Sequence, residues 1–307
     1  MKFARFTRDD HAGVGVVTDD GRIRRLAGHD DLLPLIQQGE AALHDAVRRA
    51  LAEGVEVDPA DVRILSPLAT PPTFRDFYAF EQHVKAGRAS RGLEMDPLWY
   101  EFPVFYFSNP YAFRGEGEVP MTPGSEKFDF ELEVAAVLGK GGRNLTSAEG
   151  EDAVIGYCVL NDWSGRDVQH REMQLSMGPV KGKDTATGLG PYLVTKDELA
   201  PFAKDNGFDR AMTLSVNGTV YSTANWADVY WSFGEMVAFA SRGTEVRAGD
   251  VIGSGTCGTG CILELSRTHG SERFPWLEPG DHVVATVEGL GSLRNVITKA
   301  DPVLPLR

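Results

Sequence analysis

The chain has 307 residues, of which 42% are hydrophobic and 24% charged, a composition typical of a globular protein with one large domain or two unequal ones. Its formal net charge of −13 argues against nucleic acid or an anionic membrane surface as a partner. Its three cysteines are too few for a disulfide framework, and no segment has the ~18 apolar residues of a membrane span. The first residues lack the apolar core of a signal peptide, so we expect a cytoplasmic protein.

The beginning of the chain predicts a small N-terminal accessory domain, residues 1–65. Short strands joined by a hairpin turn are expected between residues 2 and 26, and apolar residues at helical spacing predict a helix over 43–52. Prolines cluster over 67–72 and interrupt the pattern. We therefore place a domain boundary near residue 66, with the catalytic domain in 66–307.

Asp76 and His83 lie in an aromatic-rich segment beyond the prolines. A histidine seven positions after an aspartate fits a catalytic base beside a metal ligand. The two residues also fit an ordinary amphipathic helix with Asp76 as its N-cap, and taken alone they favour that interpretation. Arg88 and Arg91 follow, and either could bind an anionic substrate group in a bidentate manner.

Residues 128–134 alternate apolar and acidic side chains, which predicts a strand with Asp129, Glu131 and Glu133 on one face. Neighbours on that face lie ~7 Å apart, and like charges so close need a cation or a shared proton. The next apolar run is a predicted buried strand that ends near Asp162, a third carboxylate for the same site. Such oxygen ligands suit Mg²⁺, Ca²⁺ or Mn²⁺ rather than Zn²⁺. A solvated strand face explains Glu131 and Glu133 equally well when they are considered alone.

A helix beginning at Ser164 would place Arg166 and Gln169 on one face by i,i+3 spacing. A glycine-rich loop containing Lys183 follows, but neither the P-loop spacing nor a dinucleotide fingerprint is present. This argues against nucleotide binding.

Further along, residues 226–240 predict a helix, and strands are expected near 212–223 and 283–296. Glu264 lies in the apolar run 261–265, which we expect to be a strand. An unpaired acid buried there would be costly, so Glu264 requires a partner, such as a histidine that it orients.

Six of these stretches, taken together and in order, resemble the fumarylacetoacetate hydrolase family over residues 66–299. They are Asp76-Phe77-Tyr78 with His83, Glu131-Leu132-Glu133, Asn161 to Gln169, Gly182-Lys183, Ser254-Gly255-Thr256 and Leu263-Glu264-Leu265-Ser266. The resemblance implies an α+β, mostly β fold, in which a rolled, mixed-sheet catalytic domain follows a small N-terminal domain. It also implies a homodimer.

The resemblance further implies a role for each matching residue. The implied ligands of Mg²⁺ or Ca²⁺, with Mn²⁺ as a third candidate, are Asp76, Glu131, Glu133 and Asp162, with Thr187 near the metal. The implied catalytic residues are His83 as base, Glu264 as the acid that orients it, and Arg166, Gln169 and Lys183 as stabilisers of negative charge. The implied substrate contacts are Tyr78, Tyr106, Thr256 and Arg91, with Arg88 as an equal alternative to Arg91.

The implied activity is metal-dependent hydrolysis of a carbon–carbon bond in a 1,3-dicarbonyl acid, resembling fumarylacetoacetate or an acylpyruvate, as in aromatic catabolism. Relative to fumarylacetoacetase, one residue is inserted between Gln169 and Lys183, and Met173 replaces a substrate-binding tyrosine. These departures leave the substrate open. Oxaloacetate decarboxylation, enol–keto isomerisation and a non-catalytic metal-binding role remain as alternatives, although an intact set of His83, Glu264 and Lys183 favours catalysis.

Overall fold

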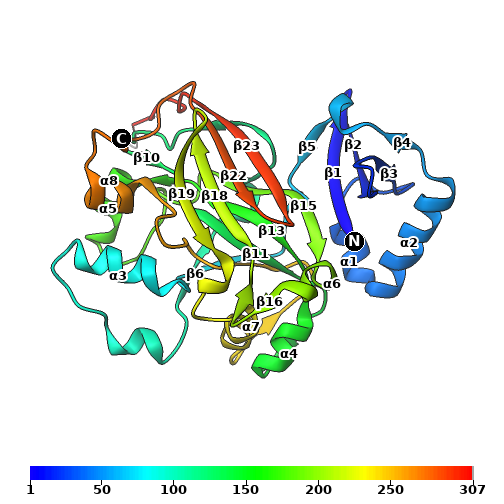
Figure 1. The fold of residues 1–307 in the computed structure, drawn as a ribbon, viewed down its shortest axis with the longest axis horizontal. Coiled ribbons are helices and arrows are strands. Elements are labelled where there is room, and N and C mark those ends of the chain that lie inside the picture. Colours follow the sequence, from blue (N-terminus) through cyan, green and yellow to red (C-terminus); the bar gives the residue numbers. More distant parts are fainter. Residues whose placement is uncertain (306–307) are drawn as a thin grey trace.

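The computed structural model describes residues 1–305 and consists mainly of two mixed sheets, neither of which closes into a barrel (Figure 1). The large sheet has the order β4 (Glu56–Val57), β3 (Ile23–Arg25), β2 (His11–Val17), β1 (Lys2–Arg8), β15 (Thr187–Thr195), β13 (Val154–Asp162), β11 (Leu132–Leu138), β21 (Val251–Gly253), β6 (Phe74–Phe77), β7 (Phe105–Ser108), with β5 (Arg63–Leu65) on β1 and β8 (Phe113–Arg114) on β15. The smaller sheet has the order β19 (Thr219–Asn225), β18 (Ala211–Val216), β22 (His282–Val287), β23 (Gly291–Thr298), β9 (Gly117–Pro120). The α+β, mostly β class predicted from the sequence is confirmed.

Short elements complete the fold. The helices are α1 (Leu33–Gln38), α2 (Glu40–Glu53), α3 (Glu81–Ala89), α4 (Ser147–Ala153), α5 (Arg166–Met173), α6 (Lys196–Leu199), α7 (Phe233–Ala240) and α8 (Ile262–His269). Two-stranded ladders join β10 (Phe128–Asp129) to β14 (Ser164–Gly165), β12 (Gly142–Arg143) to β20 (Glu245–Val246), and β16 (Ala203–Lys204) to β17 (Gly207–Phe208). Among residues 1–305, no helix has the length and apolar character needed to cross a membrane.

The central strands of the large sheet are buried on both faces. In β11, Val134 and Ala136 belong to the core that also contains side chains of the smaller sheet, whereas Ala135 and Val137 belong to a second core. That second core includes apolar residues of α1 and α2 and also Cys158, which is fully buried as a small apolar side chain, as expected. Because successive side chains of β11 point to opposite faces, this strand packs into both cores. Its end is therefore a rigid support for a site.

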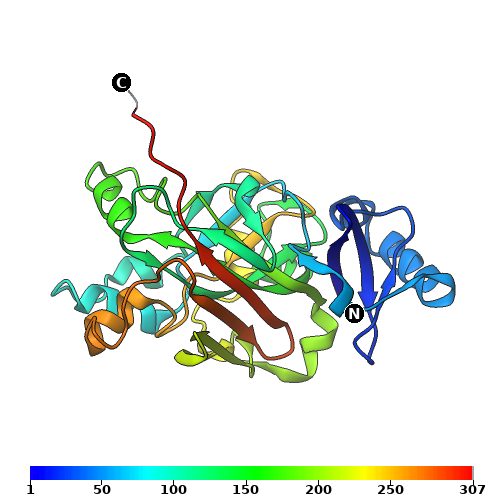
Figure 2. The same cartoon turned by 90° about the horizontal axis from the view of Figure 1, so that it is seen from above.

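The N-terminal strands belong to the same large sheet as the rest of the chain. The strands expected between residues 2 and 26 are confirmed, and the helix expected over 43–52 lies within α2. β1 pairs antiparallel with β15, so the sheet is continuous from the N-terminal part, shown in blue at one side of the molecule in Figures 1 and 2. The division of the chain near residue 66 stays a prediction.

Two helix predictions need correction. The expected helix over 226–240 is a 3₁₀ turn, Trp226–Asp228, followed by α7, because Ser232 accepts the backbone N–H of Glu235 and begins a new helix there. Asp76 does not cap a helix: it lies in β6, and α3 begins at Glu81. Figure 1 shows α3, α5 and α8 gathered at the end of the molecule away from the N-terminal strands.

Candidate active site

Four carboxylates meet near the ends of three strands in the large sheet. Asp76 lies in β6, Glu133 in β11 and Asp162 at the end of β13, while Glu131 directly precedes β11. One oxygen from each of the four lies within 4.8 Å of the others. None of the four residues is more than 6% exposed, which rules out the solvated strand face considered from the sequence.

The alternating segment 128–134 is not one continuous strand, as the sequence had predicted. It is divided into β10 and β11, because the backbone N–H of Glu131 donates to Oδ1 of Asn161 at 2.9 Å instead of joining a ladder. Asp129 consequently lies outside the group of four carboxylates, although it shares Arg166 as a hydrogen-bond partner with Glu131.

Glycines give Asp76 the space that it occupies. A Cβ atom on Gly253 would lie 2.3 Å from Oδ1 of Asp76, so a larger residue would displace the carboxylate. Gly255 has a φ of +76°, which favours glycine, and its N–H donates to the same oxygen at 3.2 Å. The Ser-Gly-Thr motif therefore helps to position one of the four acids.

Two buried cations compensate one side of the acid cluster. Lys183 Nζ donates to Oδ2 of Asp162 at 2.7 Å and also to Oε2 of Glu131. Arg166 Nη2 donates to Oε1 of Glu131 at 2.7 Å. Burial alone would raise the pKa of Glu131, but the positive charges of Lys183 and Arg166 lower it below its ordinary value.

In the part of the chain that the structure describes, no lysine or arginine hydrogen-bonds the carboxylate of Asp76 or Glu133. Burial and the neighbouring Asp162 raise the pKa of Asp76, and burial and the neighbouring Asp76 raise the pKa of Glu133. Among the described residues, Oε2 of Glu133, Oδ1 of Asp162 and Oγ1 of Thr187 are buried without a hydrogen-bond partner. Because unpartnered buried oxygens are costly, this oxygen-rich set fits a hard divalent cation, with Asp76, Glu131, Glu133 and Asp162 as the residues that would hold it.

His83 and Glu264 form a hydrogen-bonded pair beside the acids. His83 Nδ1 and Glu264 Oε2 are 2.7 Å apart, and their side chains are 12% and 9% exposed. The other oxygen of Glu264 accepts the backbone N–H of Thr259 at 2.8 Å. The partner that Glu264 was expected to need is therefore present in the structure.

Glu264 is not in a strand, contrary to the sequence prediction. It lies in the first turn of α8, where Ile262 and Leu265 are buried and Cys261 is the N-cap. An apolar run of this length does not distinguish a strand from a buried helix, and the i,i+3 spacing of its two buried residues is helical. The helix directs Glu264 to α3 and His83.

The residues predicted to contact substrate divide into two groups. Three lie at the acids or the histidine: the hydroxyl of Tyr106 donates to Oδ2 of Asp162, the hydroxyl of Thr256 is 3.4 Å from Oε1 of Glu133, and the ring of Tyr78 is 5.7 Å from that of His83. Burial raises the pKa of Tyr78 to about 12, so this phenol stays protonated and can donate at neutral pH.

The two arginines that could bind a substrate carboxylate donate hydrogen bonds to nearby backbone carbonyls instead. Nε of Arg91 donates to the carbonyl of Gly87 at 3.1 Å, and Nε of Arg88 donates to the carbonyl of Glu94, in the segment that follows the same helix. Arg91 is exposed. The choice between Arg88 and Arg91 stays open.

Arg166 has more partners than the sequence prediction gave it. Its Nη1 donates to Oε1 of Gln169 at 3.2 Å, in agreement with the expected i,i+3 spacing, and its Nε donates to Oδ2 of Asp129 at 2.7 Å. Its guanidinium therefore hydrogen-bonds three side chains of the protein. Contact between Arg166 and a substrate stays a prediction.

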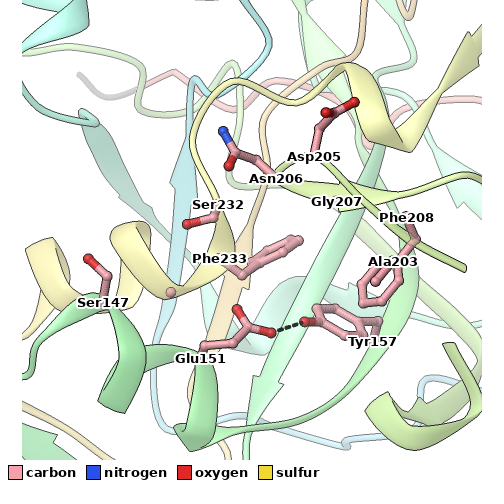
Figure 3. Close-up of a pocket in the computed structure, with 11 residues that line it drawn as sticks. Ser147, Glu151, Tyr157, Ala203, Asp205, Asn206, Gly207, Phe208, Ser232 and Phe233 are labelled. Carbon is pink, nitrogen blue, oxygen red and sulfur yellow. Dashed lines mark hydrogen bonds between the residues drawn. The ribbon is translucent and has the colours of Figure 1, made fainter. Parts of the chain in front are cut away.

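A separate cavity of about 270 Å³ lies beside α4, the β16–β17 hairpin and the start of α7. Figure 3 shows Glu151 and Tyr157 within it, joined by a hydrogen bond of 3.2 Å. None of its lining residues belongs to the acid cluster or to the His83–Glu264 pair.

Comparison with known proteins identifies the family. The model of the fumarylacetoacetate (FAA) hydrolase C-terminal domain matches residues 73–298. The chain belongs to the fumarylacetoacetate hydrolase family. A second model, described as Rv2993c-like, N-terminal, matches residues 1–67.

Relatives within the fumarylacetoacetate hydrolase family carry different activities in their names. The chain is 30% identical to a maleylpyruvate hydrolase from Aquipseudomonas alcaligenes, over 87% of this chain and 85% of that protein. It is also 30% identical to a mitochondrial oxaloacetate tautomerase from Homo sapiens, over 97% of this chain and 91% of that protein. The solved fumarylacetoacetate hydrolase from Exiguobacterium antarcticum aligns with a TM-score of 0.76 and 26% identity, over 98% of this chain and all of that one (100%).

A first prediction concerns Glu133, one of the two acids of the cluster that have a buried oxygen without a hydrogen-bond partner. Glu133→Gln keeps the volume and removes one charge, so the metal-free protein should become more stable and Mn²⁺ should no longer stabilise it. In the unchanged protein, Mn²⁺ at 100 times its Kd should add about 2.7 kcal/mol to the free energy of unfolding. Thermal unfolding in Mn²⁺ and in chelator measures both effects. Glu118→Gln, on an exposed residue of β9, is the control, and an equal response of the two variants to Mn²⁺ would contradict the prediction.

A second prediction concerns pH. Asp76 and Glu133 have raised pKa values in the fold, so their contribution to stability is complete below their ordinary values of 3.8 and 4.5 and is lost as pH rises through the raised values. Glu131 has a lowered pKa, so its contribution is complete above its ordinary value of 4.5 and is constant there. The metal-free protein should therefore lose stability as pH rises above about 4.5, the ordinary pKa of glutamate, and less so in Glu133→Gln. Denaturant unfolding at several pH values tests this, and equal slopes in the two proteins would refute it.

Proposed function

We propose that this protein is a divalent-metal-dependent hydrolase that cleaves a carbon–carbon bond in a 1,3-dicarbonyl acid, using water activated by His83. The observation that carries the proposal is the 2.7 Å hydrogen bond between His83 and Glu264 beside a cluster of four buried carboxylates. Membership of the fumarylacetoacetate hydrolase family supports it. The substrate class is consistent with the maleylpyruvate hydrolase relative.

Glu264 fixes how His83 would act as a base. A carboxylate accepts the proton on Nδ1, so the neutral imidazole carries its lone pair on Nε2, and that nitrogen can accept a proton from water. Since Thr259 holds the second oxygen of Glu264, the carboxylate cannot swing freely. Glu264 then stabilises the imidazolium that forms as the resulting hydroxide attacks the carbonyl carbon.

Cleavage leaves an electron pair on carbon, which is tolerable only as an enolate. When bound, a divalent cation would supply Lewis-acid stabilisation of the dicarbonyl oxygens. Lys183 supplies a buried positive charge at the same edge of the cluster. Gln169 has its carbonyl oxygen on Arg166, which directs its NH₂ group elsewhere and makes it available as a donor. Charge stabilisation by such fixed groups often contributes more to catalysis than any other single effect. His83, as imidazolium, returns the proton to the enolate carbon.

Tautomerisation of oxaloacetate is a second candidate. The tautomerase relative is as similar to this chain as the maleylpyruvate hydrolase is, at 30% identity. A positioned base beside a bound dicarbonyl acid can move a proton between carbon and oxygen without activating water. The cytoplasmic location and the homodimer expected from the sequence remain proposals.

A third prediction separates these activities. Acylpyruvates and oxaloacetate are assayed with Mg²⁺ or Mn²⁺ in ¹⁸O-labelled water. A hydrolase should incorporate one solvent oxygen into the carboxylate product, whereas a tautomerase should consume the enol with no carbon–carbon cleavage. Enol consumption without cleavage of any diketo acid would overturn the hydrolase proposal.

A fourth prediction concerns the histidine pair. His83→Ala should lower hydrolysis by about 10²–10⁴-fold, the usual contribution of a general base. Glu264→Gln preserves the volume but weakens the hold on His83 and on the imidazolium, so turnover should fall while Mn²⁺ affinity stays near that of the unchanged protein. Steady-state kinetics and Mn²⁺ titration measure the two quantities. Unchanged turnover in Glu264→Gln would show that Glu264 does not orient the base.

A further inference from the structure

Asp129 is a fully buried carboxylate that no part of the proposed mechanism uses. It lies in β10, whose ladder with β14 pairs Asp129 with Ser164, two residues before Arg166. Its Oδ2 accepts Nε of Arg166 at 2.7 Å. Its two oxygens also accept the backbone N–H groups of Ile262, at 2.7 Å, and Leu263, at 3.0 Å.

One side of Asp129 leads to the metal centre. The guanidinium that it binds through Nε donates through Nη2 to Oε1 of Glu131 at 2.7 Å. The guanidinium group of arginine is planar, so the hydrogen bond that holds Nε also sets the direction in which Nη2 points. Asp129 thereby determines where Arg166 holds Glu131, an acid that would bind the metal.

The other side of Asp129 leads to the histidine pair. Ile262 and Leu263 are the first two residues of α8, and their N–H groups have no partner within the helix. Asp129 satisfies both from outside the helix and places negative charge at its positive end. Glu264 is the next residue, so the start of α8 sets the position of its carboxylate at His83.

We propose that Asp129 is a positioning residue that connects the two halves of the active site: it holds Glu131 through Arg166 and Glu264 through the first turn of α8. The inference rests on the proposed function for its catalytic part. Its structural part stands on the contacts of Asp129 alone.

The neighbouring Asp167 is an acid with a similar set of hydrogen bonds but no hydrogen bond to the metal ligands or the histidine pair. It lies in α5, next to Arg166, and accepts the hydroxyl of Ser125 and the backbone N–H groups of Glu126 and Val168. Ser125 and Glu126 belong to the loop before β10, and Val168 belongs to the same helix as Asp167. Asp167 is therefore a matched control for Asp129, since both are aspartates that accept a side chain and two backbone amides.

The test compares Asp129→Asn with Asp167→Asn. An asparagine has the same shape but must place its NH₂ group against N–H donors: either against Arg166 and Leu263, or, with its oxygen kept on those two, against the backbone N–H of Ile262. Mn²⁺ affinity, measured by electron paramagnetic resonance well below the melting temperature, should fall about tenfold or more in Asp129→Asn, as is typical for groups that orient metal ligands. Asp167→Asn should bind Mn²⁺ as the unchanged protein does. At saturating Mn²⁺, kcat of Asp129→Asn should remain low because α8 is also displaced.

A second variant keeps the proposal testable if Asp129→Asn does not fold. Arg166→Lys retains the positive charge but cannot serve Asp129 and Glu131 with one planar group. It should weaken Mn²⁺ binding by a similar factor, and combining it with Asp129→Asn should add little further loss.

The outcomes distinguish the positioning role from the proposed function. Mn²⁺ affinity in folded Asp129→Asn equal to that of Asp167→Asn would overturn the positioning role, even if the melting temperature fell. Additive losses in the double variant would overturn it too. Absence of Mn²⁺ binding by the unchanged protein would instead overturn the metal site on which the proposed function rests.

Discussion

Four buried carboxylates repel one another in this structure, and the surrounding residues have to hold them together against that repulsion. Like charges a few ångströms apart in a protein interior raise one another's pKa unless cations or hydrogen bonds intervene. Here Lys183 and Arg166 lower the pKa of Glu131, whereas the pKa values of Asp76, Glu133 and Asp162 stay raised, mainly by burial. The remaining imbalance is what a divalent cation would correct.

The surrounding fold makes such repulsion sustainable. β11 and β13 are buried along their whole lengths, so packing on both faces prevents the acids from separating. Hydrogen bonds fix the remaining freedom: Asn161 holds the backbone of Glu131, and Gly255 holds Asp76. The histidine pair is built differently, between two helices, α3 and α8. The acid cluster is thus held by strands and the histidine pair by helices, so other contacts must fix the position of one relative to the other.

The sequence predicted the strands, the acid cluster and the His83–Glu264 pair, but not how they are connected. Alternation along 128–134 identified acids on one face, although it could not show that Glu131 leaves the ladder for Asn161. The run around Glu264 was assigned to a strand because short apolar runs lack a distinguishing period. Asp129 and Ile262 are 133 residues apart, and no local pattern indicates that contact. Motif resemblance supplied the chemistry, whereas the positioning contacts required the fold.

The most direct test of this account is anomalous scattering from crystals of the protein soaked in Mn²⁺. One peak per chain is expected, with oxygens of Asp76, Glu131, Glu133 and Asp162 at roughly 2.0–2.6 Å, the range of hard cations. The oxygens of Glu133 and Asp162 that are now unpartnered should be among its ligands. A peak elsewhere, or no peak while the four carboxylates keep their present partners, would show that these carboxylates do not form a metal site.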